Sequence, residues 1–131
     1  MNENGSIREY DFPSPNDETG YNIFPADLEA DPLVAFHGTA ESNLVPIIAH
    51  GFKIQGILPS ISFAKNSGFP LGLACNKRSK DSPRGVVIAV RFDSLSGPCI
   101  EEEVSCIYLY CEDKQPKIVG YSIVPEHYEH R

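Results

Sequence analysis

The tripeptide His37-Gly38-Thr39 lies between a short apolar run and a stretch with helical character. A glycine after the histidine lets a ligand approach the backbone closely. A turn from a strand into a helix also exposes unpaired backbone N–H groups and the positive end of the helix dipole. An imidazole beside such donors can hold a polar group such as an amide or a sugar hydroxyl. We therefore take His37, Gly38 and Thr39 as candidate binding residues, with a packed structural histidine as the alternative.

A second candidate site is the acidic run Glu101-Glu102-Glu103, which precedes an apolar segment. A carboxylate at the start of a strand can stabilise positive charge that develops on a substrate. The alternative is an acidic loop that simply enters a strand. Other catalytic motifs are absent from the sequence: it has no Gly-x-Ser-x-Gly elbow and no glycine-rich phosphate loop. No metal site is expected, because no cysteine or histidine spacing fits one.

Short elements must position these residues. We expect a buried strand at 33–36, followed by a helix that starts near Ser42 or Asn43 and ends at Gly51. Its apolar face follows helical spacing and consists of Leu44, Ile47 and Ile48.

Further strands are expected at 61–64, at 85–92 and at 104–111, with the segment 85–92 buried on both faces. The segment 117–124 is expected to pair back on 104–111 as a hairpin, and a short helix is expected within 67–77. Strands and helices do not alternate regularly, which predicts an α+β fold rather than a doubly wound sheet.

The length of 131 residues indicates one domain. Residues 1–30 are acidic, poor in periodicity and rich in Asn, Asp, Pro and Gly, so we expect an acidic N-terminal arm in front of a single domain at 31–131. The net charge of -7 argues against DNA or RNA as the main partner. A local basic run could still receive a phosphate group, and it contains Lys77, Arg78, Lys80 and Arg84.

Neither a membrane partner nor a secretory signal is expected, since no stretch approaches the roughly 20 apolar residues of a membrane span. The four cysteines form no Cys-x-x-Cys pair, and we expect all of them to be structural thiols in a reducing compartment. These features together predict a cytoplasmic location, in the producing cell or in a target cell into which the protein is delivered. The four residues are Cys75, Cys99, Cys106 and Cys111.

The order of these segments resembles the ADP-ribosyltransferase superfamily, in its histidine-first branch of the poly(ADP-ribose) polymerase and diphtheria-toxin type. The resemblance covers about residues 33–124, and its specific part is "FHGT…NL..II..GF" at 36–52. Weaker parts are "SISFA" at 60–64 and "GVVIAVRF" at 85–92. The resemblance implies a compact split antiparallel sheet with one or two short helices, and NAD as substrate.

Residue by residue, the resemblance implies that His37 bonds the nicotinamide ribose and that the backbone of Gly38 grips the nicotinamide carboxamide. The family tyrosine that stacks on nicotinamide is replaced by Ser62, and Phe63 or Phe69 is left as a source of the missing ring. Ser62 and Phe63 are therefore counted among the NAD-binding candidates.

The family glutamate, which bonds the ribose 2′-OH, has two possible matches. The Glu-x-Glu spacing assigns it to Glu101 and Glu103, with Glu103 preferred because it would begin a strand. A second alignment puts Ile107 at that position. No metal or covalent nucleophile is needed for this chemistry.

The resulting expectation is an NAD-dependent ADP-ribosyltransferase that modifies a protein or another macromolecule, or an NAD glycohydrolase. It includes an effector, toxin or phage protein that modifies a host. Three alternatives stay open: a non-catalytic module that binds NAD, ADP-ribose or a protein on the same fold; an enzyme like the RNA 2′-phosphotransferases; and an unrelated small α+β interaction protein.

Overall fold

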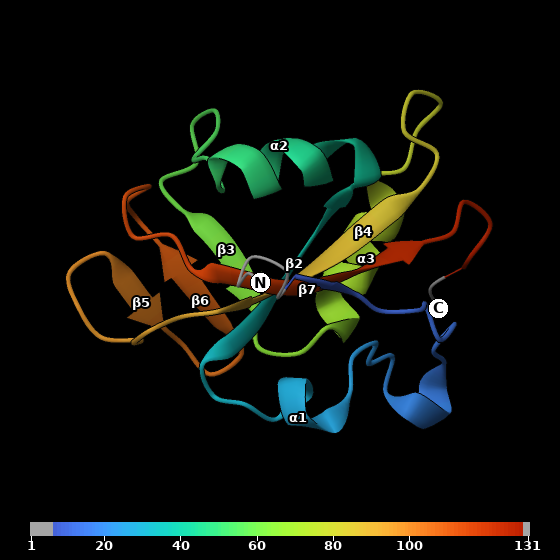
Figure 1. The fold of residues 1–131 in the computed structure, drawn as a ribbon, viewed down its shortest axis with the longest axis horizontal. Coiled ribbons are helices and arrows are strands. Elements are labelled where there is room, and N and C mark those ends of the chain that lie inside the picture. Colours follow the sequence, from blue (N-terminus) through green and yellow to red (C-terminus); the bar gives the residue numbers. More distant parts are fainter. Residues whose placement is uncertain (1–6, 130–131) are drawn as a thin grey trace.

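The structure is a computed structural model that describes residues 7–129. Its centre is a seven-stranded sheet with the order β1-β7-β4-β2-β3-β6-β5 (Figure 1). Neighbouring strands are antiparallel except for β1 and β7, which run parallel. The strands are β1 (Arg8–Glu9), β2 (Val34–Ala40), β3 (Ile61–Ala64), β4 (Gly85–Arg91), β5 (Ile100–Glu102), β6 (Cys106–Leu109) and β7 (Lys117–Val124).

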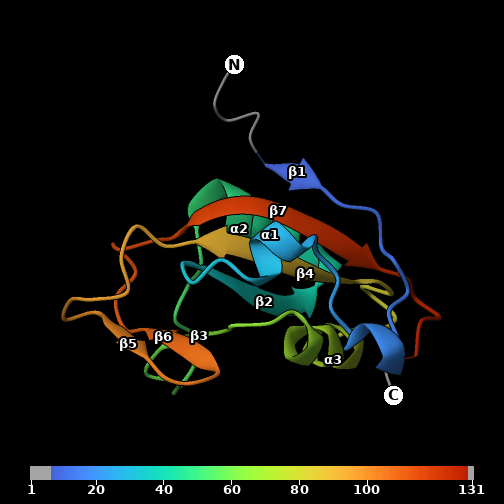
Figure 2. The same cartoon turned by 90° about the horizontal axis from the view of Figure 1, so that it is seen from below.

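Short helices cover both faces of the sheet: α1 (Ala26–Glu29), α2 (Leu44–His50) and α3 (Gly68–Asn76). α2 lies on one face, and α1 and α3 lie on the other (Figures 1 and 2). Within residues 7–129, no helix has the length and apolar character needed to cross a membrane. A mixed sheet with a few short helices confirms the expected α+β class.

Strand β4 explains why the core has two parts. Val86, Ile88 and Val90 point into the core under α2, whereas Val87 and Ala89 point into the core under α1 and α3. All five side chains are fully buried, as expected for a strand with helices on both faces. The prediction of a strand buried on both sides is confirmed.

Helix α2 ends where the sequence predicts, because Gly51 follows it with a left-handed φ of 84°. Its start differs in detail. Asn43 gives no side-chain cap, and its amide instead donates a hydrogen bond to Thr39 Oγ1 at 2.8 Å. The apolar face is narrower than predicted, since Leu44 is buried but Ile48 is 41% exposed.

Strand β2 is longer than the predicted strand at 33–36. It continues through His37 and Gly38 to Ala40, because β4 pairs with it along its whole length, as far as Ala40 with Gly85. His37 therefore lies within a strand, and the expectation of a strand-to-helix turn at this residue is wrong.

The predicted hairpin between 104–111 and 117–124 is also wrong. β6 pairs with β3 and β5, whereas β7 pairs with β4 and β1 on the other side of the sheet. The hairpin that forms instead is β5–β6, in which Glu101 faces Tyr108. Local turn residues at 112–115 were compatible with either arrangement, and sheet order decided between them.

Cys99 and Cys111 form a disulfide, which corrects the expectation that all four cysteines are free thiols. Their Cα atoms lie 5.6 Å apart at the open end of the β5–β6 hairpin. The hairpin creates this proximity, and a separation of 12 residues gives no sequence signal for it. Cys75 and Cys106 are not part of a disulfide. Because disulfides persist mainly in oxidising compartments, the cysteines do not support a reducing compartment.

The described part of the acidic N-terminal segment, residues 7–30, contributes to the core. Ile23, Phe24 and Leu28 are each 6% exposed and pack with the cluster under α1 and α3. The carboxylate of Glu29 accepts hydrogen bonds from the backbone N–H and the hydroxyl of Ser67, just before α3. These contacts fix the position of α3 against the sheet.

Candidate functional site

The sheet is almost split between β2 and β3. These two strands pair at one position only, Phe36 with Ala64, whereas β2 pairs with β4 at seven successive positions. The half-sheet on the far side of the split contains β3, β6 and β5. A split of this kind leaves backbone groups of β2 without a neighbouring strand.

Gly38 is the residue whose backbone meets the split. The N–H of Phe92 donates to the carbonyl of Leu33, and the N–H of Glu41 donates to that of Arg84, at the two ends of the β2–β4 ladder. Hydrogen-bonding pairs alternate in an antiparallel ladder, so the odd-numbered residues of β2 bond to β4. The N–H and C=O of Gly38 therefore point toward β3, and no residue of β3 is a ladder partner of Gly38.

The side chain of His37 points to the face of β2 that α2 covers, and its ring reaches across the split to β3. Its Nδ1 is 3.0 Å from the backbone carbonyl oxygen of Ser62. A carbonyl can only accept a hydrogen bond, so Nδ1 carries the proton. Nε2 is then left with a lone pair that can accept a hydrogen bond from a hydroxyl or amide.

The charge state of His37 follows from its surroundings. Burial lowers the pKa of His37 from its usual value of 6.5, the hydrogen bond to Ser62 opposes this in part, and the charge of Lys77 lowers the pKa further. The imidazole is therefore neutral at pH 7. A neutral ring fixed through one nitrogen suits ligand binding through the other.

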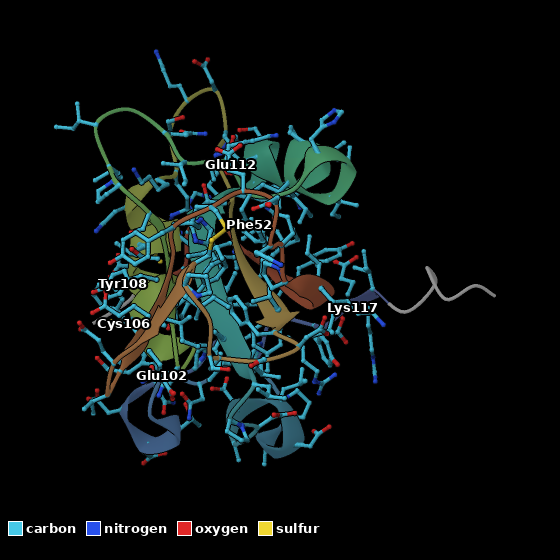
Figure 3. All side chains as sticks on the ribbon, turned by 90° about the vertical axis from the view of Figure 1, so that its left-hand side faces the viewer. Phe52, Glu102, Cys106, Tyr108, Glu112 and Lys117 are labelled. Atoms are coloured by element: carbon cyan, nitrogen blue, oxygen red, sulfur yellow. A yellow bond between two sulfur atoms is a disulfide. The ribbon has the colours of Figure 1, made fainter. Side chains whose placement is uncertain are left out.

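Two phenylalanines hold the imidazole in place. The ring of Phe52 lies 5.1 Å from that of His37, and the ring of Phe63 lies 5.6 Å from it. Gln115 fixes Phe52 by accepting from its N–H at 2.8 Å and donating to its carbonyl at 2.9 Å. Glu112, from the same turn and labelled in Figure 3, accepts a hydrogen bond from the backbone N–H of Ile54 at 2.7 Å. The sequence analysis missed Phe52 and Gln115, because nothing local links residues 63 positions apart.

Gly38 and Thr39 are both buried, and each has a structural role. A Cβ atom at Gly38 would lie 2.0 Å from the carbonyl oxygen of Pro70, so only glycine lets α3 lie this close to β2. Thr39 is 8% exposed and accepts the hydrogen bond from Asn43. Thr39 is thus committed to packing, whereas Gly38 also presents its backbone to the split.

The two candidates on β3 face opposite sides. Phe63 is 1% exposed and packs between Phe52 and Phe92, so it belongs to the core and has no face free for a ligand. Ser62 is exposed on the other face of the strand. In the structure Phe63 supports His37, and its contact with a ligand stays a prediction.

Glu101 and Glu103 lie on the hairpin beyond β3. Glu101 is in β5, the edge strand, which is three strand spacings from β2, on the order of 14 Å. Its carboxylate accepts a hydrogen bond from Tyr110 at 2.7 Å. Glu103 lies in the turn before β6 rather than at the start of a strand, and Ile107, the other match for the family glutamate, is fully buried.

Glu101 lies on a polar face of the half-sheet that also carries Ser62 and Tyr108. Ser62 faces Tyr108, and Tyr108 faces Glu101, so all three side chains share one side of the half-sheet. Cys106 Sγ donates to the Tyr108 hydroxyl at 3.1 Å, and Figure 3 shows these two residues beside each other. The neighbouring Cys106 side chain is the main reason that the pKa of Tyr108 is raised to about 12. The phenol is therefore uncharged at neutral pH.

Helix α3 forms the other border of this face. Leu71 and Ala74 are buried against the sheet, and Cys75 packs on the flank toward the C-terminal segment. Helical spacing places Leu73 and Lys77 together on the opposite flank, toward β3. The effect of Lys77 on the pKa of His37 agrees with this placement.

Only part of the basic run is available for a ligand. Arg84 makes a two-bond ion pair with Glu41, at 2.8 Å for each bond. Arg78 is held by backbone carbonyls, including that of Glu126 at 3.0 Å. Lys77 and Lys80 make no ion pair within residues 7–129. Lys77 is the one of these two that lies near His37.

The remaining features lie away from His37. A shallow cavity of about 380 Å³ is lined by residues of the loops 92–100 and 113–116, and none of the predicted site residues lines it. Cys99, Cys111 and Asp113 are close enough to share a metal ion, but the two sulfur atoms are joined in the disulfide. A disulfide sulfur is not a thiolate ligand, so this cluster holds no metal while it is oxidised.

No protein-family model matches this chain, and no curated protein matches it either. The functional interpretation therefore rests on the site itself.

Proposed function

We propose that the protein binds NAD at the split between β2 and β3 and transfers its ADP-ribose part to an acceptor. The observation that carries this proposal is the state of His37, which is neutral, fixed through Nδ1 and left with Nε2 as an acceptor. Beside it, the backbone donor and acceptor of Gly38 point toward β3, which has no ladder partner for Gly38. A ribose hydroxyl and a carboxamide need this combination of partners.

In the proposed reaction the bond between the ribose and nicotinamide breaks, and the bonding electrons leave with nicotinamide. The ribose becomes an oxocarbenium-like cation, to which a nucleophilic group of the acceptor adds with loss of its proton. His37 orients the ribose through its hydroxyl groups, and Gly38 orients the leaving nicotinamide. A carboxylate of Glu103 or Glu101 stabilises the cation electrostatically. Lys77 supplies a positive charge for the diphosphate at the border formed by α3.

A non-catalytic NAD or ADP-ribose module is a second candidate, and one observation favours it. Glu101 lies about three strand spacings from β2, and its carboxylate is already bonded to Tyr110. A site with the binding residues and without a close carboxylate would hold the ligand but not activate it. No comparable observation favours the RNA 2′-phosphotransferase alternative, because Arg78 and Arg84 are engaged within the protein.

The test is to incubate the purified protein with NAD, with and without cell lysate, and to measure nicotinamide release and NAD binding by calorimetry. The variants are His37→Ala, Glu101→Ala and Glu103→Ala. His50→Ala is the matched control, because His50 is an exposed histidine at the end of α2.

Release that needs lysate, His37 and a glutamate supports a transferase and directs the search to the labelled acceptor. Release without lysate indicates a glycohydrolase. Binding that needs His37 but gives no release identifies the binding module. If the protein neither binds nor consumes NAD, or if His37→Ala behaves like His50→Ala, the proposal is wrong.

A further inference from the structure

The nicotinamide ring of NAD is flat and positively charged. Aromatic faces hold such rings by stacking and by cation–π attraction. The residues placed around the split so far, His37, Gly38 and Ser62, supply polar groups but no free aromatic face. An aromatic residue that stacks on nicotinamide must therefore come from elsewhere in the structure, an inference that rests on the proposed function.

Most aromatic rings near the split are unavailable. Phe52 and Phe63 are 2% and 1% exposed and pack against each other and His37. Phe69 is 66% exposed, but the next two residues of α3, Pro70 and Leu71, are buried against the sheet. Its ring lies on the same flank of α3 as Leu73 and Lys77, toward β3, but it projects from a helix and not from the sheet face that carries Ser62.

Tyr108 is in a different position. It is the direct partner of Ser62 in the β3–β6 ladder, so the two Cβ atoms are about 5 Å apart on the same face. Ser62 is small and exposed, so its side chain does not cover the side of the Tyr108 ring that faces β3. The hydroxyl is anchored to Cys106 at 3.1 Å, so the ring is fixed at its far end.

The neighbouring tyrosine provides a contrast. Tyr110 lies on the same strand face, but its hydroxyl bonds Glu101 of the edge strand, and its backbone N–H bonds Cys99. It lies beyond the end of β6, and the β3–β6 pairing ends at Leu109. Tyr110 thus belongs to the outer edge of the hairpin, whereas Tyr108 lies within the β3–β6 ladder, opposite Ser62.

We propose that Tyr108 receives the nicotinamide ring of NAD, across the space that Ser62 leaves on β3. The Tyr108 ring comes from the neighbouring strand β6 and does the work of a large side chain at residue 62. Gly38 approaches the ligand from β2, on the opposite side of Ser62, and His37 reaches it through the split from the α2 face of the sheet.

The experiment measures binding of NAD, ADP-ribose and free nicotinamide to the full chain by calorimetry. Tyr108→Ala is expected to weaken NAD binding by about tenfold or more, as loss of one stacked ring does, and to leave ADP-ribose binding within about twofold. Tyr108→Phe keeps the ring and is expected to bind NAD like the unmodified chain. Tyr110→Ala is the matched control and is expected to change little.

The decisive variant exchanges the two cross-strand partners, Ser62→Tyr with Tyr108→Ser. It returns an aromatic ring to the same face, one strand closer to His37, and is expected to recover most of the NAD affinity that Tyr108→Ala loses. Retained ADP-ribose binding in each variant shows that the protein is folded.

Two results overturn this inference while leaving the proposed function intact. One is NAD binding that Tyr108→Ala leaves unchanged. The other is an equal loss of NAD and ADP-ribose binding in Tyr108→Ala. If the unmodified chain binds none of the three compounds, the proposed function itself is wrong, and the inference fails with it.

Discussion

The two halves of the sheet, on either side of the split, use their strands differently. β4, in the half with β1, β7 and β2, buries six successive residues because helices cover both of its faces. β6, in the half with β3 and β5, alternates between buried Ile107 and Leu109 and the more exposed Cys106 and Tyr108. The first half is committed to stability on both sides. The second keeps one polar face free, and that face borders the proposed NAD site.

Substitution of Gly38 by alanine is expected to have the largest effect, because it acts where α3 packs on the first half. The added Cβ would lie 2.0 Å from the Pro70 carbonyl oxygen, and backbone on both sides leaves little room to relax. We expect a loss of about 3 kcal/mol in the free energy of unfolding, measured by urea denaturation. Gly56→Ala is the control: its φ of 63° strains any side chain, but no atom lies within 4 Å. A smaller loss for Gly38→Ala than for Gly56→Ala would contradict the close packing of α3 on β2.

Removal of the disulfide tests the second half. Cys99→Ser with Cys111→Ser is expected to lower the free energy of unfolding by about 2–3 kcal/mol, the usual value for a loop of this length. Reductant should have the same effect on the unmodified chain and none on the double variant. Cys75→Ser, which changes a cysteine outside the disulfide, is the control. An unfolding midpoint of the unmodified chain that reductant leaves in place would show that the hairpin does not depend on the bond.

A smaller effect is expected at the boundary between the halves, from the titration of His37. Its folded-state pKa is below the unfolded value of 6.5, so the unfolded chain binds a proton first as the pH falls. The stabilisation is therefore complete above the unfolded pKa and is lost as the pH decreases through it toward the folded pKa. Urea unfolding between pH 5 and 7.5, compared with His37→Asn, isolates this contribution, and NMR titration of the imidazole locates the pKa. A His37 that titrates above 6.5 would contradict the burial argument.

Local patterns were informative wherever packing repeats with a fixed period. The continuous β-branched run at 85–92 predicted a strand buried on both faces, and β4 is such a strand. Gly51 predicted the end of α2 because a left-handed residue favours glycine. These signals depend on neighbours in the sequence, so they are visible without the fold.

Sheet order and long-range contacts were not visible in the same way. The segment 117–124 was expected beside 104–111. It lies beside β4 instead, in the half of the sheet that contains β1, β4 and β2. The disulfide between Cys99 and Cys111 depends on the β5–β6 pairing. The placement of Phe52 against His37 depends on Gln115, which lies 63 residues later in the sequence.

The sequence by itself determined the α+β class, the core strand β4, the end of α2 and the choice of His37 and Gly38 as the residues to examine. Only the tertiary structure decided that His37 lies within a strand, that Phe63 is core, and that Glu101 and Glu103 lie beyond β3. It also brought Ser62 and Tyr108 opposite each other. The physical reason is that periodic burial is encoded locally, whereas the pairing of distant strands is selected by the packing of the whole sheet.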